Sequence, residues 1–576
     1  MKQSWLLGCC LIIAAGCASK LPTPRPIREV VYLDQNWSAD GRDWFHHASQ
    51  GTATLPVPYS WFLALEQPAL SLGEVPLLAD ESNLVRYGFL TSPKSHYNPD
   101  GLPVGFARDP EQVDPVNGHS FDAIGFTCAA CHTGQIEYRG TAIRIEGGPA
   151  TTDLGKFRND LKWALAYTKL VPGRFSRFAR RVLGDHHTAA AERDLKQQFD
   201  VVLADAKAKA DMETKAEAGI EEGFMRLDAL GSIANLVFGV ELDARNVAPL
   251  IAPVAYPHIW DTPWFDWVQY NGSIRQPMVR NAGEAMGVNA RVNLRGEPKD
   301  RYRSTVRVQE LFDIEQLVAG PEPFAGLRAP RWPEDVLGPI DRDRAQRGAA
   351  LYAAHCQKCH LPPVGSPELM SSSYWTSPNA ASERYLRLQM VKISYVGTDP
   401  NQAKTMTDRK IDTGVLGFGQ LSYGEALGKV VEETAKRWYD EHEIPLPRRD
   451  QMNGNRPNDA RASLEYKARP LDGIWATPPY LHNGSVPDLY SMFLPGEERP
   501  SPVYLWTREY DPKRVGYVNA EDANGTRLDV ADQTKTKPGN SNRGHEFRDG
   551  PLGNGVIGPL LKDEERWDLV EYLKTL

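Results

Sequence analysis

Two short motifs of the same form carry the chemistry that this chain's residue types allow. Residues 128–132 read Cys-Ala-Ala-Cys-His, and residues 356–360 read Cys-Gln-Lys-Cys-His. Two cysteines at this spacing can each form a thioether bond with a haem vinyl group, and the adjoining histidine can coordinate the iron. The sequence therefore predicts two covalently bound haem c groups. The expected haem-binding residues are Cys128, Cys131, His132, Cys356, Cys359 and His360.

Other uses of a Cys-x-x-Cys pair fit the sequence less well. The chain has seven cysteines, and the three outside the motifs are Cys9, Cys10 and Cys17. A zinc site with four cysteines would have to join two motifs in different halves of the chain, unlike the short spacing of zinc ribbons. A thioredoxin-like dithiol is expected at a strand-to-helix turn of a βαβ unit. The sequence pattern predicts that context for neither motif.

The composition predicts helices joined by long loops. The 576 residues include 48 glycines and 44 prolines, concentrated between the recognisable helices. We therefore expect a mainly α fold with long irregular loops and a few short strands. The net charge of −8 argues against nucleic acid as a partner.

The first seventeen residues resemble an export signal. Lys2 is followed by an apolar run over 6–15, and small residues precede Cys17. This pattern is typical of a bacterial lipoprotein signal peptide, cleaved before a lipidated Cys17; a plain signal peptide is the alternative. No acidic residue directly follows Cys17, which favours the outer membrane. We expect a periplasmic protein of a Gram-negative bacterium that contacts the membrane through a lipid anchor only.

A proline-rich segment near 328–342 predicts a boundary between two cytochrome c-type haem domains in tandem. The first covers 18–335, with a helical insertion at about 188–222, and the second covers 340–576. Local patterns predict a hairpin over 135–145, a helix from Asp153 and a helix over 343–352 that leads into the second motif. An amphipathic helix over 560–573, capped by Asp563, resembles the closing helix of a cytochrome c domain.

The second axial ligand of each iron decides its function, because an open position allows chemistry and a second strong ligand makes an electron carrier. No histidine follows His132 until His186, so we expect the first iron to be open or weakly ligated. Glu284 could act as a general acid–base in peroxide cleavage. Arg280 could stabilise negative charge on oxygen or pair with a haem propionate. The full set of candidate distal residues is Trp267, Arg280, Asn281, Ala282 and Glu284.

Three side chains are candidates for the sixth ligand of the second iron: His482, Met492 and His545. The glycine- and asparagine-rich segment 539–547 suits a backbone bent to deliver a side chain into a pocket. We therefore favour His545.

Several blocks resemble the bacterial di-haem cytochrome c peroxidase superfamily, which also contains the methylamine dehydrogenase maturation enzyme. They are the two haem motifs and residues 478–485, Pro-Pro-Tyr-Leu-His-Asn-Gly-Ser. Within the superfamily, 276–285 and 539–547 are most similar to the rubber oxygenase branch, near which the di-haem fatty-acid dioxygenases also belong.

The resemblance implies that the haem of His132 is the reaction centre and that the haem of His360 is an electron relay with His545 as sixth ligand. Gly496 stands near the position of the methionine ligand of the peroxidases, which also favours His545. Trp267 matches one of two aromatic residues near dioxygen in rubber oxygenases, whereas Ala282 stands where the second is expected. Some relatives also hold a calcium ion between the haems.

These observations predict an exported di-haem c-type cytochrome oxidoreductase that activates dioxygen or hydrogen peroxide at the first haem. Oxygenation of an apolar, unsaturated, lipid-like substrate is favoured. The alternative is a cytochrome c peroxidase that reduces hydrogen peroxide, and a second alternative is a pure electron-transfer cytochrome. A small cytochrome or another periplasmic electron donor is the expected protein partner.

Overall fold

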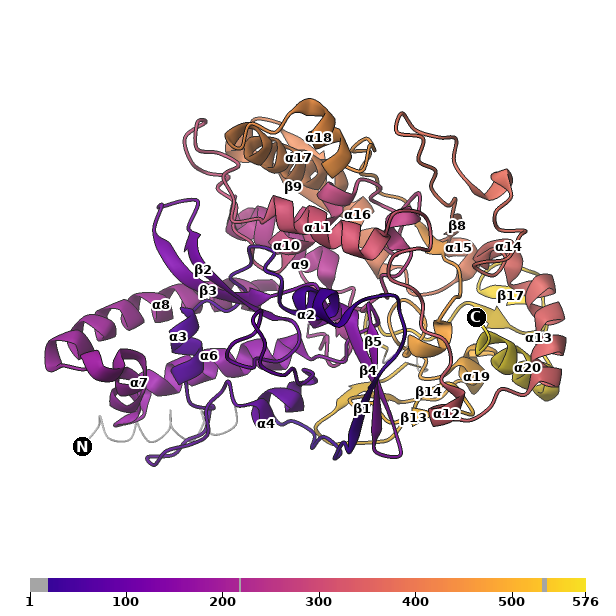
Figure 1. Ribbon diagram of the computed structural model, residues 1–576, viewed down its shortest axis with the longest axis horizontal. Helices are drawn as coiled ribbons and strands as arrows, with labels where there is room; N and C mark the ends of the chain where they lie inside the picture. Colours follow the sequence, from indigo (N-terminus) through magenta and orange to yellow (C-terminus); the bar gives the residue numbers. More distant parts are fainter. Residues whose placement is uncertain (1–18, 217–218, 531–535) are drawn as a thin grey trace.

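The computed structural model describes residues 19–216, 219–530 and 536–576 (Figure 1). Helices account for 37 % of the structure and strands for 15 %, so helices predominate but strands are more than the few expected. Long loops join both kinds of element, as the glycine and proline content predicts. Within the described ranges, no helix is both long enough and apolar enough to cross a bilayer.

The strands form eight small sheets within the described residues. The largest has three strands: β1 (Glu29–Tyr32) is parallel to β5 (Thr141–Glu146), which is antiparallel to β4 (Thr133–Tyr138). Strands β4 and β5 are the expected hairpin, and the turn residues Arg139 and Gly140 have φ of 51° and 86°. The other strands pair in twos: β2 (Phe106–Val113) with β3 (Ser120–Phe126), β6 (Arg226–Leu227) with β7 (Val254–Ala255), β8 (Gln389–Lys392) with β11 (Glu465–Ala468), β9 (Lys410–Asp412) with β10 (Gln420–Ser422), β12 (Val503–Leu505) with β15 (Thr526–Leu528), β13 (Tyr510–Asp511) with β14 (Gly516–Tyr517), and β16 (Glu546–Phe547) with β17 (Val556–Gly558).

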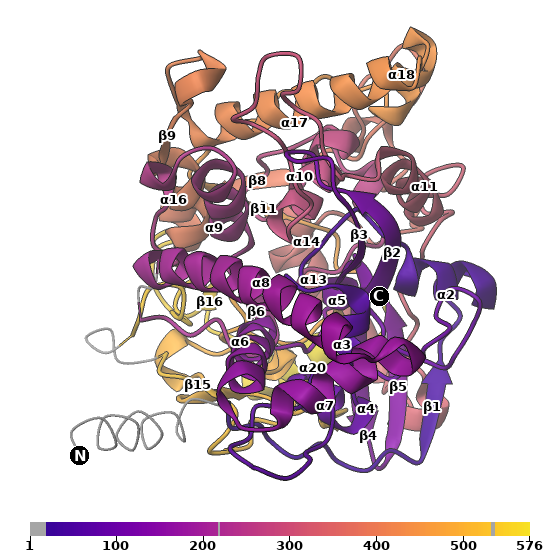
Figure 2. The ribbon, with the colours of Figure 1, turned by 90° about the vertical axis from the view of Figure 1, so that its left-hand side faces the viewer.

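Three helices follow the hairpin at one end of the long axis of the molecule (Figure 1): α6 (Leu154–Leu170), α7 (Arg174–Leu183) and α8 (Ala189–Ala216). The Asp153 side chain caps α6 by accepting from the Lys156 amide at 2.9 Å. The apolar face of α6 is buried, and it consists of Leu154, Phe157, Leu161 and Leu165. Helix α8 is one long helix that crosses the face seen in Figure 2, and it buries Leu195 and Phe199. Both helix predictions for this part of the chain are confirmed.

Helices α13 (Arg342–His355) and α20 (Asp563–Leu573) pack together at the opposite end of the long axis (Figure 1). A Cβ on Gly348 of α13 would lie 2.0 Å from the carbonyl oxygen of Asp568, so only glycine allows this approach. The expected cap of α20 is wrong in one detail. Asp563 is the first helical residue, and the backbone amide of Lys562 donates to the Glu565 carboxylate at 2.7 Å.

The remaining helices are short connectors or surround the middle of the molecule. They are α2 (Ala39–His47), α3 (Tyr59–Ala64), α4 (Glu81–Leu84), α5 (Ala129–His132), α9 (Ala229–Ala234), the π-helix η3 (Asn235–Val240), α10 (Pro277–Gly287), α11 (Val308–Ala319), α12 (Glu334–Leu337), α14 (Gln357–His360), α15 (Ile393–Val396), α16 (Asn401–Asp408), α17 (Tyr423–Glu441), α18 (Leu446–Met452) and α19 (Leu489–Met492). Helix α10 lies between α9 and α17, because Gly287 is close to Ile233 and Gly283 faces Leu427.

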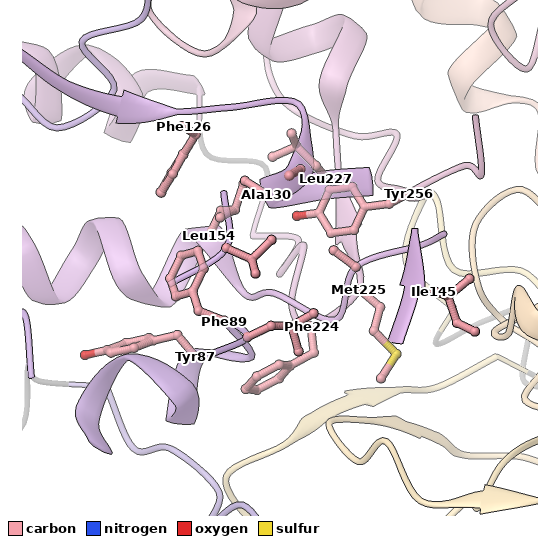
Figure 3. Close-up of a cluster of buried hydrophobic side chains, with 14 of the residues drawn as sticks. Tyr87, Phe89, Phe126, Ala130, Ile145, Leu154, Phe224, Met225, Leu227 and Tyr256 are labelled. Atoms are coloured by element: carbon pink, nitrogen blue, oxygen red, sulfur yellow. The ribbon is translucent and has the colours of Figure 1, made fainter. Parts of the chain in front are cut away.

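Two apolar clusters stabilise this arrangement, and both draw on residues from either side of the predicted boundary near 328–342. The larger cluster reaches from Leu21 to Leu573, and the smaller from Leu230 to Met452. Part of the larger cluster, shown in Figure 3, gathers Phe126 and Ala130 with Tyr256 and other apolar side chains. The two proposed domains therefore share their cores, and their limits stay a prediction.

Replacing Gly348 by alanine should destabilise the α13–α20 pair. Alanine is the better helix former, but its methyl group would overlap the α20 backbone, and such overpacking costs about 1–3 kcal/mol. We expect a lower thermal midpoint by circular dichroism. The control is Ala353→Gly on the exposed face of the same helix, which costs about 1 kcal/mol through helix propensity alone. A Gly348→Ala protein as stable as the unchanged chain would contradict the close packing.

Candidate functional site

The first Cys-x-x-Cys-His motif lies between two strands. Strand β3 ends at Phe126, the single turn α5 contains the motif histidine, and β4 begins directly at Thr133. A strand thus precedes this motif, which the sequence pattern does not predict. The arrangement still differs from a thioredoxin site, because α5 is one turn long rather than the start of a long helix.

Tight backbone contacts fix the position of the first motif. The Thr127 amide donates to the Gly105 carbonyl at 2.9 Å, and a Cβ on Gly105 would lie 2.4 Å from Cα of Ala130. The Thr127 hydroxyl donates to the His46 carbonyl at 3.0 Å. Ala130 also packs into the apolar cluster of Figure 3, beside Leu227 and Tyr256. The small spacer residues of this motif therefore allow close packing on both sides.

The second motif lies at the end of a helix. The Cys356 amide donates to the Tyr352 carbonyl at 2.8 Å, so α13 runs directly into the motif turn α14. The Tyr352 hydroxyl donates to the Leu361 carbonyl at 2.7 Å and ties the end of the motif to the helix. This is the helical context that the sequence predicts.

Both motif histidines are oriented in the same way. Nδ1 of His132 lies 2.8 Å from the Pro257 carbonyl oxygen, and Nδ1 of His360 lies 2.8 Å from the Arg469 carbonyl oxygen. A carbonyl can only accept, so each Nδ1 carries the proton and donates. Nε2 of each ring then keeps its lone pair, the tautomer that a metal-ligating histidine needs.

The protonation states fit haem attachment rather than disulfide redox chemistry. Burial raises the pKa of Cys128, Cys131 and Cys356 to about 12. Redox-active dithiols instead have a lowered thiol pKa. Burial also lowers the pKa of His132 to about 4, against the opposing effect of its bond to Pro257. The imidazole is therefore neutral at ordinary pH and able to coordinate a metal.

His545 is the candidate whose ring faces that of His360. The two ring centroids are 6.1 Å apart. Two metal–imidazole bonds of about 2 Å, with the distance from each nitrogen to its ring centre, need about 6 Å. The other candidate histidine, His482, instead stacks on Tyr466 with centroids 4.3 Å apart. Met492, the third candidate, borders a cavity that His360 and His545 also line.

The loop that carries His545 is held in an unusual conformation. His545 has φ of 50°, in the left-handed region that non-glycine residues seldom adopt. The buried Arg499 guanidinium donates to the Gly544 carbonyl at 3.0 Å and to the His545 carbonyl at 2.8 Å. The His545 amide donates to the Val396 carbonyl at 2.7 Å. These bonds offset the backbone strain and direct the imidazole toward His360.

A cavity of about 430 Å³ adjoins the second motif. Its walls include Cys356, Cys359, His360 and His545, and apolar side chains make up much of the rest. Two cysteine thiols, a neutral imidazole and a second imidazole at this spacing are the donor set that a covalently bound haem requires. The residues present therefore fit this group.

The candidate distal residues of the first motif form a charged network on α10 and α11. The Arg280 guanidinium pairs with the Glu315 carboxylate, and Nδ2 of Asn281 donates to the same carboxylate at 3.1 Å. Nε2 of Gln269 donates to Oε1 of Glu284 at 2.7 Å. Burial raises the pKa of Glu284, although Arg280 opposes the shift.

This network lies close enough to the first motif to act on it. Besides burial, the negative charge of Glu284 raises the pKa of the Cys128 thiol, and the positive charge of Arg280 lowers it. Arg280 also contributes to the lowered pKa of His132, after burial. Arg280 and Glu284 are therefore within electrostatic range of this motif. Asn281 belongs to the network through Glu315, and Ala282 is buried on the same helix.

Trp267 has a different environment from these residues. Its ring is covered by two guanidinium groups, that of Arg461 at 3.6 Å from the ring centroid and that of Arg275 at 5.3 Å. Cation–π contacts of this kind hold the indole in place. Cys17 lies outside the described residues.

Sequence reasoning missed several residues of the site. Glu315 had a detectable signal, because it interrupts the apolar stripe of α11 at the position where Leu311 and Val318 predict an apolar side chain. Gln269 had none, because its φ of 65° is set by the surrounding fold. Pro257 and Arg469 act through backbone carbonyls, which no side-chain pattern marks.

No group of three or more His, Cys, Asp or Glu side chains is arranged to hold a metal ion in the part of the chain that the structure describes. The calcium ion that the resemblance allows stays a prediction.

Comparison with known families bears on the second motif region. Residues 465–506, which begin with β11 and include Arg469 and His482, match the family described as RoxA-like, cytochrome c-like. With the α13–α20 pair and the second motif, this match defines the C-terminal part as a cytochrome c-like domain of the kind that binds haem c. Residues 465–506 are thus similar to a RoxA-like cytochrome c domain, and this similarity supports haem c binding in this part of the chain.

Two relatives from Sinorhizobium fredii show the extent of the family. The chain is 49 % identical to "Uncharacterized protein y4iJ", over 99 % of this chain and 98 % of that protein. It is 27 % identical to "Uncharacterized protein y4iM", over 57 % of this chain and 66 % of that protein. The chain therefore belongs to the family of y4iJ, because this chain and y4iJ are similar over nearly their whole lengths.

The raised pKa of Glu284 predicts how a Glu284→Gln variant changes stability with pH. The folded state favours the protonated carboxyl, so the unchanged protein loses stability as pH rises above the ordinary carboxyl pKa of about 4.3. Glutamine removes this loss. In thermal melts of the purified protein, the midpoint of the variant should therefore rise, relative to the unchanged chain, between pH 4 and pH 7.

The matched control is the exposed Glu564→Gln, for which we expect the same midpoint difference at both pH values. A Glu284→Gln difference that stays constant or shrinks with rising pH would contradict the assigned direction of the shift.

Proposed function

We propose that this protein is an exported di-haem c-type cytochrome oxidoreductase that activates dioxygen or hydrogen peroxide at the haem of His132. In this proposal the haem of His360, with His545 as its sixth ligand, relays electrons. A bound haem iron with an open coordination position supplies the redox chemistry. The chain's own residues orient the ligands, exclude water and supply charge and protons.

The observation that carries the proposal is the difference between the surroundings of the two motifs. His360 faces His545 at the spacing of two ligands on one iron, which suits an electron carrier. The first motif instead lies in the field of Glu284 and Arg280, an acid and a cation. Charged groups of this kind serve proton transfer and the stabilisation of negative oxygen.

Glu284 is suited to hold and deliver a proton. Its Oε1 accepts from Gln269, which leaves Oε2 as the oxygen that can carry the proton. Burial raises its pKa, which keeps the carboxyl protonated at higher pH than usual. The Glu315 carboxylate partly neutralises Arg280. Arg280 therefore contributes a weakened positive charge at a fixed position, not the full charge of an unpaired cation.

A cavity near the first motif supports an apolar substrate and therefore oxygenation over peroxide reduction. Its walls are mainly apolar but also include charged side chains such as Asp153 and Lys156. The cavity measures about 460 Å³, and its walls include Phe126, Leu154, Leu161 and Leu227. Phe126 lies just before the first motif, and Gly287 at the end of α10 also borders the cavity. A lipid-like, unsaturated molecule suits such walls. Peroxide reduction is the second candidate, because Glu284 would serve either reaction.

The second motif region offers an approach for an electron donor. Leu552 and Tyr395 border its cavity and are 63 % and 39 % exposed. We propose a small cytochrome or another periplasmic donor as partner. Export, lipidation at Cys17 and attachment to the outer membrane are part of the same proposal, and they rest on the first seventeen residues.

The visible spectrum tests the assignment of the two irons. Mass analysis should show two haem groups on the mature chain, and carbon monoxide should bind to one of them after reduction. Replacing His545 by alanine should convert the second haem from low to high spin and make it bind carbon monoxide as well. The matched control, His482→Phe, borders the same cavity and should leave the spectrum unchanged. Two low-spin haems that ignore carbon monoxide in the unchanged protein would overturn the proposal.

Turnover assays separate the two candidate reactions. We expect oxygen consumption with oleate or polyisoprene to exceed peroxide-dependent oxidation of a reduced cytochrome. Glu284→Gln should lower turnover by about 100-fold or more, the usual contribution of a general acid–base. Activity with peroxide alone would discard the oxygenase version and leave the peroxidase.

A further inference from the structure

The two carbonyl groups that orient the motif histidines belong to one connected structure. His132 donates to the carbonyl of Pro257, and His258 is the next residue in the chain. Nη1 of Arg469 donates to the carbonyl of His258 at 2.9 Å, and Nη2 approaches the carbonyl of Trp260 at 3.4 Å. The carbonyl of the same Arg469 accepts from His360. A single arginine therefore contacts the supports of both histidines.

The connection contains no gap wider than a hydrogen bond. It leads from the imidazole of His132 through the Pro257–His258 peptide to the Arg469 guanidinium, along that side chain to its carbonyl, and on to the imidazole of His360. The three hydrogen bonds measure 2.8, 2.9 and 2.8 Å. Everything between them is covalent, so electronic coupling is stronger along this route than across an unfilled space of the same length.

Arg469 is held firmly and keeps its charge. Burial lowers its pKa to about 10, while Asp472 and Asp261 oppose the shift, so the guanidinium stays protonated at neutral pH. It also lies 5.4 Å from the centroid of the Phe265 ring. Its positive charge reaches His132 and contributes, after burial and Arg280, to the lowered pKa of that ring. The charge of Arg469 thus acts at the first motif, and its backbone carbonyl acts at the second.

We propose that Arg469 is the positioning residue that couples the two haem sites, and that the electron passing between them follows the Arg469–His258–Pro257 connection. The inference rests on the proposed function, because it requires both haems. One electron leaves the reduced site at His360 and one arrives at the oxidised site at His132. No bond forms or breaks, and the Nδ1 and guanidinium protons stay on their donors.

A competing route would use aromatic rings. The His258 ring packs on that of Trp260, with centroids 4.2 Å apart, and Nε2 of His258 is buried with no hydrogen-bond partner among the described residues. The proposed connection uses only the peptide carbonyl of His258. The variant His258→Leu keeps that carbonyl and removes the aromatic ring, so it separates the two routes.

The test is the rate of electron transfer between the haems in the full-length, two-haem protein. One haem is reduced rapidly, and the spectra of both are followed. Arg469→Lys keeps the charge but loses the branched donor, so transfer should slow by about tenfold, within the range for changes along a coupling network. Arg469→Gln should slow transfer and also lower the midpoint potential of the haem at His132, because a nearby positive charge favours the reduced iron. His258→Leu should keep transfer within about twofold of the unchanged rate.

Arg456→Lys is the matched control. Arg456 is also buried and donates to a backbone carbonyl, that of Asp266, but this carbonyl holds no motif histidine. We expect unchanged transfer and unchanged potentials. Potentials are read from each haem separately, so a simple loss of folding, visible as lost haem, is distinguished from lost coupling.

Transfer at the unchanged rate in both Arg469 variants would overturn the inference while leaving the proposed function intact. Slowing by His258→Leu as large as that by Arg469→Lys would assign the route to the rings and also overturn the inference. A mature chain with fewer than two haems would instead show that the proposed function itself fails.

Discussion

The structure depends on two hydrogen bonds from imidazole Nδ1 to peptide carbonyls. Each bond fixes the proton on Nδ1 and leaves Nε2 of His132 or His360 as a metal ligand. Burial acts in the same direction, because it disfavours the charged imidazolium. Without these bonds a buried histidine could adopt either tautomer, and its Nε2 would not always be free to coordinate a metal.

The two motifs reach this common geometry from different local structures. The first is held between strands, with Gly105 against Ala130, whereas the second ends the helix α13. The neighbouring elements then give the sites different properties. A loop clamped by Arg499 directs His545 toward the second site, and α10 supplies an acid and a cation to the first. The second motif therefore has an imidazole opposite its histidine, whereas the first has charged side chains in its surroundings.

Buried charges in this protein are satisfied in pairs or by carbonyl groups. Arg280 pairs with the Glu315 carboxylate, and Arg499 donates to carbonyls of the loop that carries His545. An isolated buried charge would cost several kcal/mol, so each of these arginines needs its partners. The same bonds hold the partner side chain or backbone in place. Arg469 follows the same rule, and the carbonyls it satisfies happen to lie beside the supports of both histidines.

The local elements could be predicted from the sequence because their signals are local. The hairpin over 135–145, the helix beginning near Asp153 and the helix leading into Cys356 are confirmed, since each depends on residues within a few positions. The strand content and the strand before the first motif were not predicted. Short strands pair across long intervals, and their sequences carry little periodicity.

The sequence by itself determined the chemical groups of this protein: two Cys-x-x-Cys-His motifs, whose spacing is covalent and needs no fold to be recognised. Only the tertiary structure decided which histidine faces His360, which carboxylate pairs with Arg280 and which carbonyls hold the imidazoles. Those choices join residues far apart in the chain through packing and hydrogen bonds. Backbone carbonyls are identical in every residue, so their position in space, rather than their sequence, gives them a role.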